Sequence, residues 1–191
     1  MILASLFFAT MSVCIKFASG HFHTFELVFY RGLIGMVIMA SLCRAQGVSI
    51  RTPVPLMHVW RSIIGVMSLS AWFYAIAHLP LATAMTLNYM SSVWIAAFLL
   101  GGALLLQGRN TPIARQGPLF ATVLAGFAGV AMVLRPSLAP DQVLGAIVGL
   151  ASGVTSALAY LQVSALSRVG EPESRTVFYF SLGAVIAGAM G

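Results

Sequence analysis

Arg31 is the side chain whose surroundings point most directly to chemistry. It stands inside the apolar stretch Phe25–Cys43, whose nineteen residues would form a helix about long enough to cross a membrane. Arg31 would then lie roughly 10 Å from the start of that helix. A cation at such depth is costly in hydrocarbon and usually faces a protein interior or a water-filled cavity. Several interpretations stay open. Arg31 binds an anionic part of a substrate, or it pairs with a group in a segment missing from this sequence. Otherwise it is structural, and either bonds to carbonyl, tyrosine or asparagine groups or extends to the membrane interface.

No carboxylate in the sequence is placed to neutralise Arg31. Of the four acidic residues, Asp141, Glu171 and Glu173 lie in predicted loops. Glu26 precedes Arg31 by five residues, which turns it ~140° away on a helix of 3.6 residues per turn. Arg31 therefore needs another kind of partner.

Two further charges lie near the ends of apolar stretches. Lys16 is about four residues from the end of the first stretch, so its long side chain can reach the membrane interface. Glu26 suits a helix N-terminus, where a carboxylate meets free N–H groups. Each is either a coupling charge or a structural one.

Two later stretches carry polar and aromatic side chains that suit a cavity. In the first, Trp72 and Tyr74 could line a cavity. Trp72 shares one helix face with Arg61, Gly65 and Ser68, at i, i+4, i+7 and i+11, and the small residues of that face allow close approach of another helix. In the second, the Asn88 amide must find a hydrogen-bond partner, either another helix or a substrate. The predicted substrate or cavity contacts are Arg31, Trp72, Tyr74, Asn88 and Tyr89.

Motifs for catalysis or ATP hydrolysis do not occur in the sequence. It contains no Gly-x-Ser-x-Gly, no Cys-x-x-Cys and no Walker-type Gly-Lys-Ser/Thr run. We expect no catalytic residues, no metal site and no cofactor. Any transport would be driven by gradients or by exchange.

The composition is that of a membrane protein with several spans. Of the 191 residues, 60% are hydrophobic and 7% are charged, whereas soluble domains carry about 25% charged residues. The net charge of +6 comes mostly from residues between spans, so we interpret it as a determinant of topology and not as a nucleic-acid surface. The predicted spans are 2–18, 25–43, 59–78, 82–106, 118–134, 143–166 and 176 onward.

The basic residues also predict an orientation. One side holds Lys16 and Arg135. The other side holds Arg44, Arg51, Arg61, Arg109, Arg115, Arg168 and Arg175. Because basic loops stay in the cytoplasm, we expect the N-terminus there as well.

An internal repeat is predicted from two similar helix pairs. Residues 150–167 and the span after them resemble residues 3–19 and the span after those, and Phe178-Tyr179-Phe180 echoes Phe29-Tyr30-Arg31. Five spans separate the copies. An odd number would insert the second copy inverted, as in many transporters.

Three stretches resemble the EamA-type branch of the drug/metabolite transporter superfamily. They are Phe25–Arg31, Leu79–Ala84 followed by Asn88–Trp94, and Gly126–Val130 followed by Leu134-Arg135-Pro136. The resemblance implies an all-α bacterial inner-membrane carrier with two inverted five-helix repeats around a central cavity. Its members move amino acids, nucleotide-related metabolites, S-adenosylmethionine or drugs.

The resemblance also predicts the domain organisation. Residues 1–136 correspond to the first five-helix repeat, and residues 143–191 to the first two helices of an incomplete second repeat. We expect a secondary transporter of a small organic metabolite that works by alternating access, with the lipid bilayer as its surroundings and no nucleic-acid partner. The alternatives are an inactive truncated fragment and, less favoured, an intramembrane enzyme; a homodimer also stays open.

Overall fold

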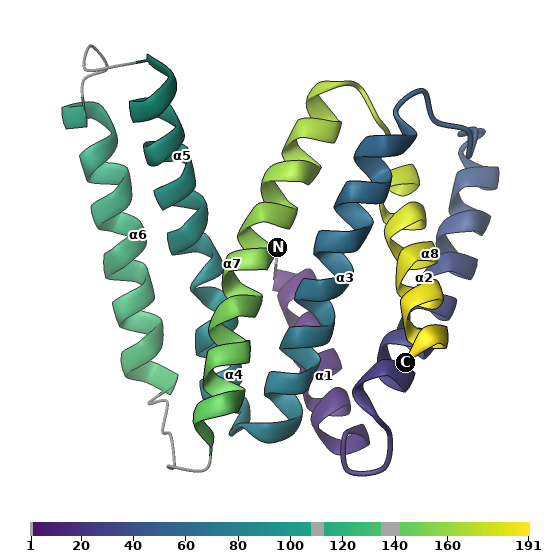
Figure 1. The fold of residues 1–191 in the computed structure, drawn as a ribbon, viewed down its shortest axis with the longest axis horizontal. Helices are drawn as coiled ribbons and strands as arrows, with labels where there is room; N and C mark the ends of the chain where they lie inside the picture. The colour runs from purple at the N-terminus through teal and green to yellow at the C-terminus, as the bar shows by residue number, and fades with distance from the viewer. Residues whose placement is uncertain (1, 108–112, 135–141) are drawn as a thin grey trace.

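The structure, a computed structural model, describes residues 2–107, 113–134 and 142–191 (Figure 1). The described residues form eight helices and no strand. Their bounds are α1 Ile2–Ala18, α2 Thr24–Ala45, α3 Pro55–His78, α4 Leu81–Tyr89, α5 Ser91–Gln107, α6 Ile113–Leu134, α7 Val143–Arg168 and α8 Glu173–Met190. The all-α fold predicted from the sequence is confirmed.

Helix α3 is the centre of the fold and packs against α1, α2, α4, α7 and α8. It supplies most of the buried apolar core, including Phe73 and Ile76, which are at most 1% exposed. Ile15 of α1, Val28 of α2 and Ala184 of α8 complete this core from the surrounding helices. Residues on α3 are therefore placed precisely relative to all five neighbours.

Glycines allow α7 to approach α3 and α4 closely. A Cβ at Gly149 would lie 2.9 Å from Leu87 Cδ1, and one at Gly153 would lie 2.8 Å from the Leu87 carbonyl oxygen. Gly145, Gly149 and Gly153 are all buried. Their spacing of four residues predicts such a packing ridge, which the structure confirms.

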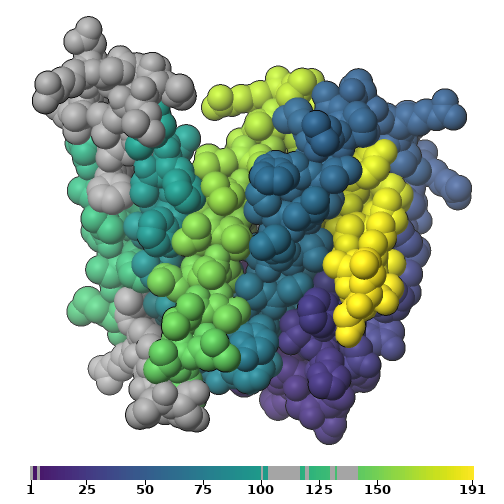
Figure 2. Space-filling view, in the orientation of Figure 1, coloured from purple at the N-terminus to yellow at the C-terminus, as the bar shows by residue number. Residues whose placement is uncertain are grey.

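Helices α2 and α8 also meet at backbone distance. A Cβ at Gly32 would lie 2.9 Å from Ala184 Cβ, and one at Gly188 would lie 2.7 Å from the Phe29 backbone nitrogen. Figure 2 shows α8 lying alongside α3 on the visible face. Helix α8 thus closes one side of the bundle between α2 and α3.

Two predicted helix boundaries are wrong. The span predicted at 82–106 is divided at Met90, where the Met90 N–H bonds to the Leu87 carbonyl oxygen three residues back. This tighter turn separates α4 from α5. Helix α6 begins at Ile113, so Pro118 lies inside it and not at its first position. At this position, the sixth of the helix, proline cannot donate the backbone hydrogen bond to the carbonyl four residues earlier.

Three helices, α2, α3 and α7, are by length and composition able to cross a membrane. Large apolar side chains such as Ile34 and Val37 of α2 and Ile147 of α7 are more than half exposed. In a bilayer such side chains face lipid, where their exposure is favourable.

Candidate functional site

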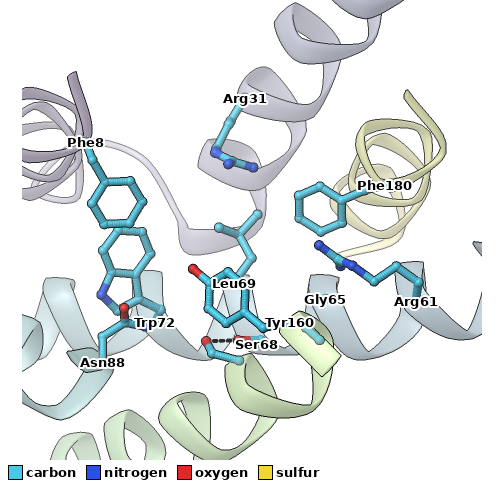
Figure 3. Close-up of a pocket in the computed structure, with 12 residues that line it drawn as sticks. Phe8, Arg31, Arg61, Gly65, Ser68, Leu69, Trp72, Asn88, Tyr160 and Phe180 are labelled. Atoms are coloured by element: carbon cyan, nitrogen blue, oxygen red, sulfur yellow. Dashed lines mark hydrogen bonds between the residues drawn. The ribbon is translucent and has the colours of Figure 1, made fainter. Parts of the chain in front are cut away.

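A cavity of about 160 Å³ lies where six helices converge (Figure 3). Helix α3 contributes five of its lining residues, and α1, α2, α4, α7 and α8 supply the rest. The lining consists of Phe8, Arg31, Arg61, Gly65, Ser68, Leu69, Trp72, Asn88, Ser156, Ala159, Tyr160 and Phe180. We call this the central cavity.

Two arginines from different helices share one aromatic ring in the central cavity. The Arg31 guanidinium carbon lies 5.7 Å from the centroid of the Phe180 ring. That of Arg61 lies 4.7 Å from the same centroid. Both are within the range of a cation–π contact. Among residues 2–107, 113–134 and 142–191, no carboxylate forms an ion pair with either arginine.

Gly65 gives the Arg61 side chain its position. It lies one helical turn after Arg61, and a Cβ there would collide with Arg61 Nη1 and lie 2.9 Å from Phe180 Cε2. The guanidinium therefore lies directly over the backbone of α3. The sequence needs glycine here so that Arg61 and Phe180 can both approach.

Aromatic and amide groups form the opposite part of the cavity wall. The Phe8 ring stacks on Trp72 with 5.2 Å between centroids and 9° between planes. Trp72 is 4% exposed, and its Nε1 finds no hydrogen-bond partner in the part of the chain that the structure describes. Asn88 lies beside Trp72 in the close-up (Figure 3). This end offers a buried N–H donor next to a side-chain amide.

Hydroxyl groups join α3 to α7 at the base of the cavity. Ser68 donates to the Ser152 carbonyl oxygen at 3.2 Å, and its hydroxyl is 2.6 Å from that of Ser156. Tyr160 lines the cavity one turn further along α7. The Ser68–Ser156 pair fixes how α3 and α7 are rotated, and hence how the cavity is lined.

The structure divides the predicted substrate contacts into two groups. Arg31, Trp72 and Asn88 all line the central cavity. Tyr74 does not line it; its ring stacks on His78 at 4.0 Å between centroids. Tyr89 does not line it either and is 43% exposed.

The two predicted coupling or structural charges both bind backbone groups at helix ends. Lys16 Nζ donates to the carbonyl oxygens of Ile76, Ala77 and Leu79 at 2.7, 3.1 and 2.8 Å, at the C-terminal end of α3. Glu26 accepts a hydrogen bond of 2.8 Å from the His23 N–H at the start of α2. A helix C-terminus favours a cation, here Lys16, and a helix N-terminus favours an anion, here Glu26. Both contacts favour the structural interpretation.

Sequence reasoning did not include Arg61 among the site residues, although a signal was present. Arg61 was counted with the basic residues that set topology, yet it shares a helix face with Gly65, Ser68 and Trp72. All four line the central cavity. Phe180 and Phe8 carried no such signal, because single phenylalanines are common throughout apolar helices.

A second group of charged and polar residues lies outside the cavity, at the turn between α7 and α8. We call Thr52, His58, Glu171 and Arg175 the Glu171 cluster. Thr52 and Arg175 donate hydrogen bonds of 2.8 and 2.9 Å to the Glu171 carboxylate. His58 Nε2 lies 3.4 Å from the same carboxylate. The cluster joins the loop before α3 to the turn before α8.

The surroundings of Glu171 hold its pKa below the ordinary value. Burial alone would raise the pKa of this carboxyl. The hydrogen bonds from Thr52 and Arg175, the Arg175 charge and the nearby His58 act in the opposite direction and outweigh burial.

Sequence comparisons relate the chain to known proteins. The sequence model of the EamA-like transporter family matches residues 1–135. The pseudopaline exporter CntI of Pseudomonas aeruginosa is 35% identical over 180 residues, which cover 94% of this chain and 60% of that protein. An uncharacterized transporter of Helicobacter pylori is 24% identical over 193 residues, which cover 100% of this chain and 62% of that protein. The S-adenosylmethionine uptake transporter of Rickettsia bellii is 20% identical over 125 residues, 63% of this chain and 39% of that protein.

No solved structure matches the chain. The chain spans about 60% of the length of the Pseudomonas relative. The family and the names of the relatives describe transport and not an enzymatic reaction. The prediction of an EamA-type protein of the drug/metabolite transporter superfamily is confirmed: this helical membrane protein belongs to the EamA-like transporter family.

Proposed function

We propose that this chain belongs to a secondary transporter that moves a small organic metabolite across a bacterial inner membrane by alternating access. The central cavity is the observation that carries the proposal. It combines two arginines, an amide and hydroxyl groups from separate apolar helices. Polar groups within apolar helices are costly and mark substrate or ion pathways. The names of the Pseudomonas and Rickettsia relatives, an exporter and an uptake transporter, support a small-molecule substrate.

The packing of α2 with α8 supports the proposed inverted repeat. These two helices carry the matching Phe-Tyr pairs, at Phe29-Tyr30 and Phe178-Tyr179. They pack closely at Gly32 and Gly188. Where a pseudo-twofold axis relates two repeats, equivalent helices that lie beside the axis contact each other. We assign residues 1–136 to the first repeat and 143–191 to the start of the second.

The orientation is part of the same proposal. The loop after α2 and the turn after α7 lie at the same end, because Arg175 Nε donates to the Ser49 carbonyl oxygen at 2.8 Å. Arg44, Arg51 and Arg168 lie at or next to these segments. This concentration of basic residues supports a cytoplasmic location for that end and for the N-terminus. Reporter fusions in the 46–53 loop should report the cytoplasm; a periplasmic signal would reverse the orientation.

Reconstitution of the purified chain in liposomes tests transport itself. The substrates to offer are isotope-labelled amino acids, nucleotides and S-adenosylmethionine. We expect Trp72→Phe, which removes the indole N–H and keeps a ring in the core, and Asn88→Ala to lower the transport rate about fivefold, because each removes a contact worth about 1 kcal/mol.

Tyr74→Phe is the matched control, since Tyr74 lies outside the cavity. It should leave the rate within about twofold of wild type. If wild type moves none of these compounds, the inactive-fragment alternative gains support. If all three variants lose activity equally, the central cavity is not the substrate site.

A further inference from the structure

We infer that the central cavity binds an oxyanion group of its substrate at Arg31 and Arg61, so that the substrate class is a small organic anion. The inference rests on the proposed transport function and specifies the substrate of the same site. The shared chemistry is that of a carboxylate or phosphate group. A guanidinium recognises either group with paired, charge-assisted hydrogen bonds.

The first argument is the charge balance of the cavity. Arg31 and Arg61 both face it, and among the residues that the structure describes none of those lining it is acidic. Glu171 and Glu173 border a separate hollow that Arg61 also lines. Within the described ranges, neither glutamate forms an ion pair with Arg61. Two like charges around Phe180 repel each other, and an anion between them would remove that repulsion.

The second argument is the balance of donors and acceptors. Nε and Nη1 of Arg61 and Nε1 of Trp72 are buried, and no acceptor for them occurs among the residues described. Buried N–H groups in proteins are nearly always paired. Guanidinium and indole groups can only donate hydrogen bonds. A ligand that satisfies them must therefore be rich in acceptors, as an oxyanion is.

The third argument concerns size and access. The cavity volume of about 160 Å³ is below the ~300–1,000 Å³ typical of sites for drug-sized ligands. A single carboxylate or phosphate group suits this space. Arg61 also lines the separate hollow near the α7–α8 turn, which Arg168 lines too. Arg61 therefore borders both spaces, and the second one is lined by Arg168, Glu171 and Glu173 as well.

The test uses proteoliposomes of this chain loaded with an isotope-labelled metabolite extract from bacteria. Mass spectrometry identifies the compounds that cross the membrane and distinguishes carboxylates from organic phosphates. We expect carboxylates, organic phosphates or both to be the main compounds that cross the membrane. Arg31→Gln and Arg61→Gln should each lower their rates by about 10- to 100-fold, the loss expected for one charge-assisted contact. Arg61→Lys should fall between wild type and Arg61→Gln.

Arg44→Gln is the matched control, because Arg44 lies on α2 with Arg31 but is exposed. It should keep the wild-type rate, and none of the variants should have a lower thermal midpoint than wild type. Transport of only neutral or cationic compounds, unaffected by Arg31→Gln and Arg61→Gln, would overturn the inference and leave the proposed function intact. If nothing crosses, the proposed function fails and the inference with it. An anionic lipid that co-purifies with wild type but not with these two variants would assign the site to a lipid headgroup and also overturn the inference.

Discussion

The Glu171 cluster and the central cavity hold charges in opposite ways. In the cluster, Glu171 accepts hydrogen bonds from Thr52 and Arg175, and its side chain is 2% exposed. In the cavity, Arg31 and Arg61 share the Phe180 ring. No ion pair to either arginine is found in the described part of the chain. In the cluster the carboxylate has its donors, although both ring nitrogens of His58 lack a hydrogen-bond partner among the described residues; in the cavity, Nε and Nη1 of the Arg61 guanidinium lack an acceptor there.

This difference separates charges that stabilise the fold from charges available to a ligand. A carboxylate that is fully hydrogen-bonded ties together the segments that supply its donors. A buried guanidinium without an acceptor lowers stability. Substitutions in the cluster should therefore affect stability first, and substitutions in the cavity should affect transport first.

Gly65→Ala should give the largest effect, a loss of transport of about 10- to 100-fold. The added Cβ would displace Arg61 and Phe180 together, which removes a charge-assisted contact without removing the arginine itself. Initial transport rates in proteoliposomes measure it. Gly126→Ala is the matched control, because a Cβ at Gly126 meets nothing within 4 Å. Equal rates for the two variants would show that the position of Arg61 does not matter.

Glu171→Ala should lower the free energy of unfolding by about 1–3 kcal/mol, because Thr52 and Arg175 lose their acceptor. Thermal unfolding in detergent measures it. Glu173→Ala serves as the control: Glu173 is exposed and only favours the start of α8, for about 0.3–1 kcal/mol. A stable Glu171→Ala protein that no longer transports would contradict the division between the two regions.

Lys16→Met should destabilise the protein by about 1 kcal/mol, because three carbonyl oxygens at the end of α3 lose a charged donor. Transport per folded molecule should stay within about twofold of wild type. A normal thermal midpoint combined with lost transport would instead make Lys16 a coupling residue. The thermal midpoint and the transport rate, measured on the same preparation, decide between these roles.

The sequence was sufficient to predict the helical fold, because long apolar stretches separated by polar loops have few other solutions in a membrane. It was also sufficient to place Arg31, Trp72 and Asn88 as cavity candidates, since a polar group in an apolar stretch stands out. The same reasoning was not sufficient for Tyr74 and Tyr89, which do not line the cavity, because a tyrosine is amphipathic and suits an interface, a stacked pair or a cavity equally well.

What the sequence could not provide was the contact between distant helices. Phe180 is 119 residues from Arg61, and their contact depends on how α3 and α8 pack. The Glu171 cluster likewise joins Thr52 to Glu171 across 119 residues. The break at Met90 was missed for a related reason. Gly153 of α7 approaches the Leu87 carbonyl there, and periodicity along a single helix does not report such a contact.

The smallest expected effect is a difference in acid stability between wild type and Glu171→Gln. The folded-state pKa of Glu171 is lowered from its ordinary value of 4.5. Its stabilising contribution is therefore complete above about pH 4.5 and is lost as the pH falls through the lowered pKa. The thermal midpoint of wild type should decrease as the pH is lowered through that acid range. The thermal midpoint of Glu171→Gln should not show this decrease, because its amide does not titrate there. Measured from pH 7 downward, the two curves should converge in acid. Parallel curves would mean that Glu171 contributes no charge-dependent stability, so that the cluster would differ from the cavity in hydrogen bonding alone.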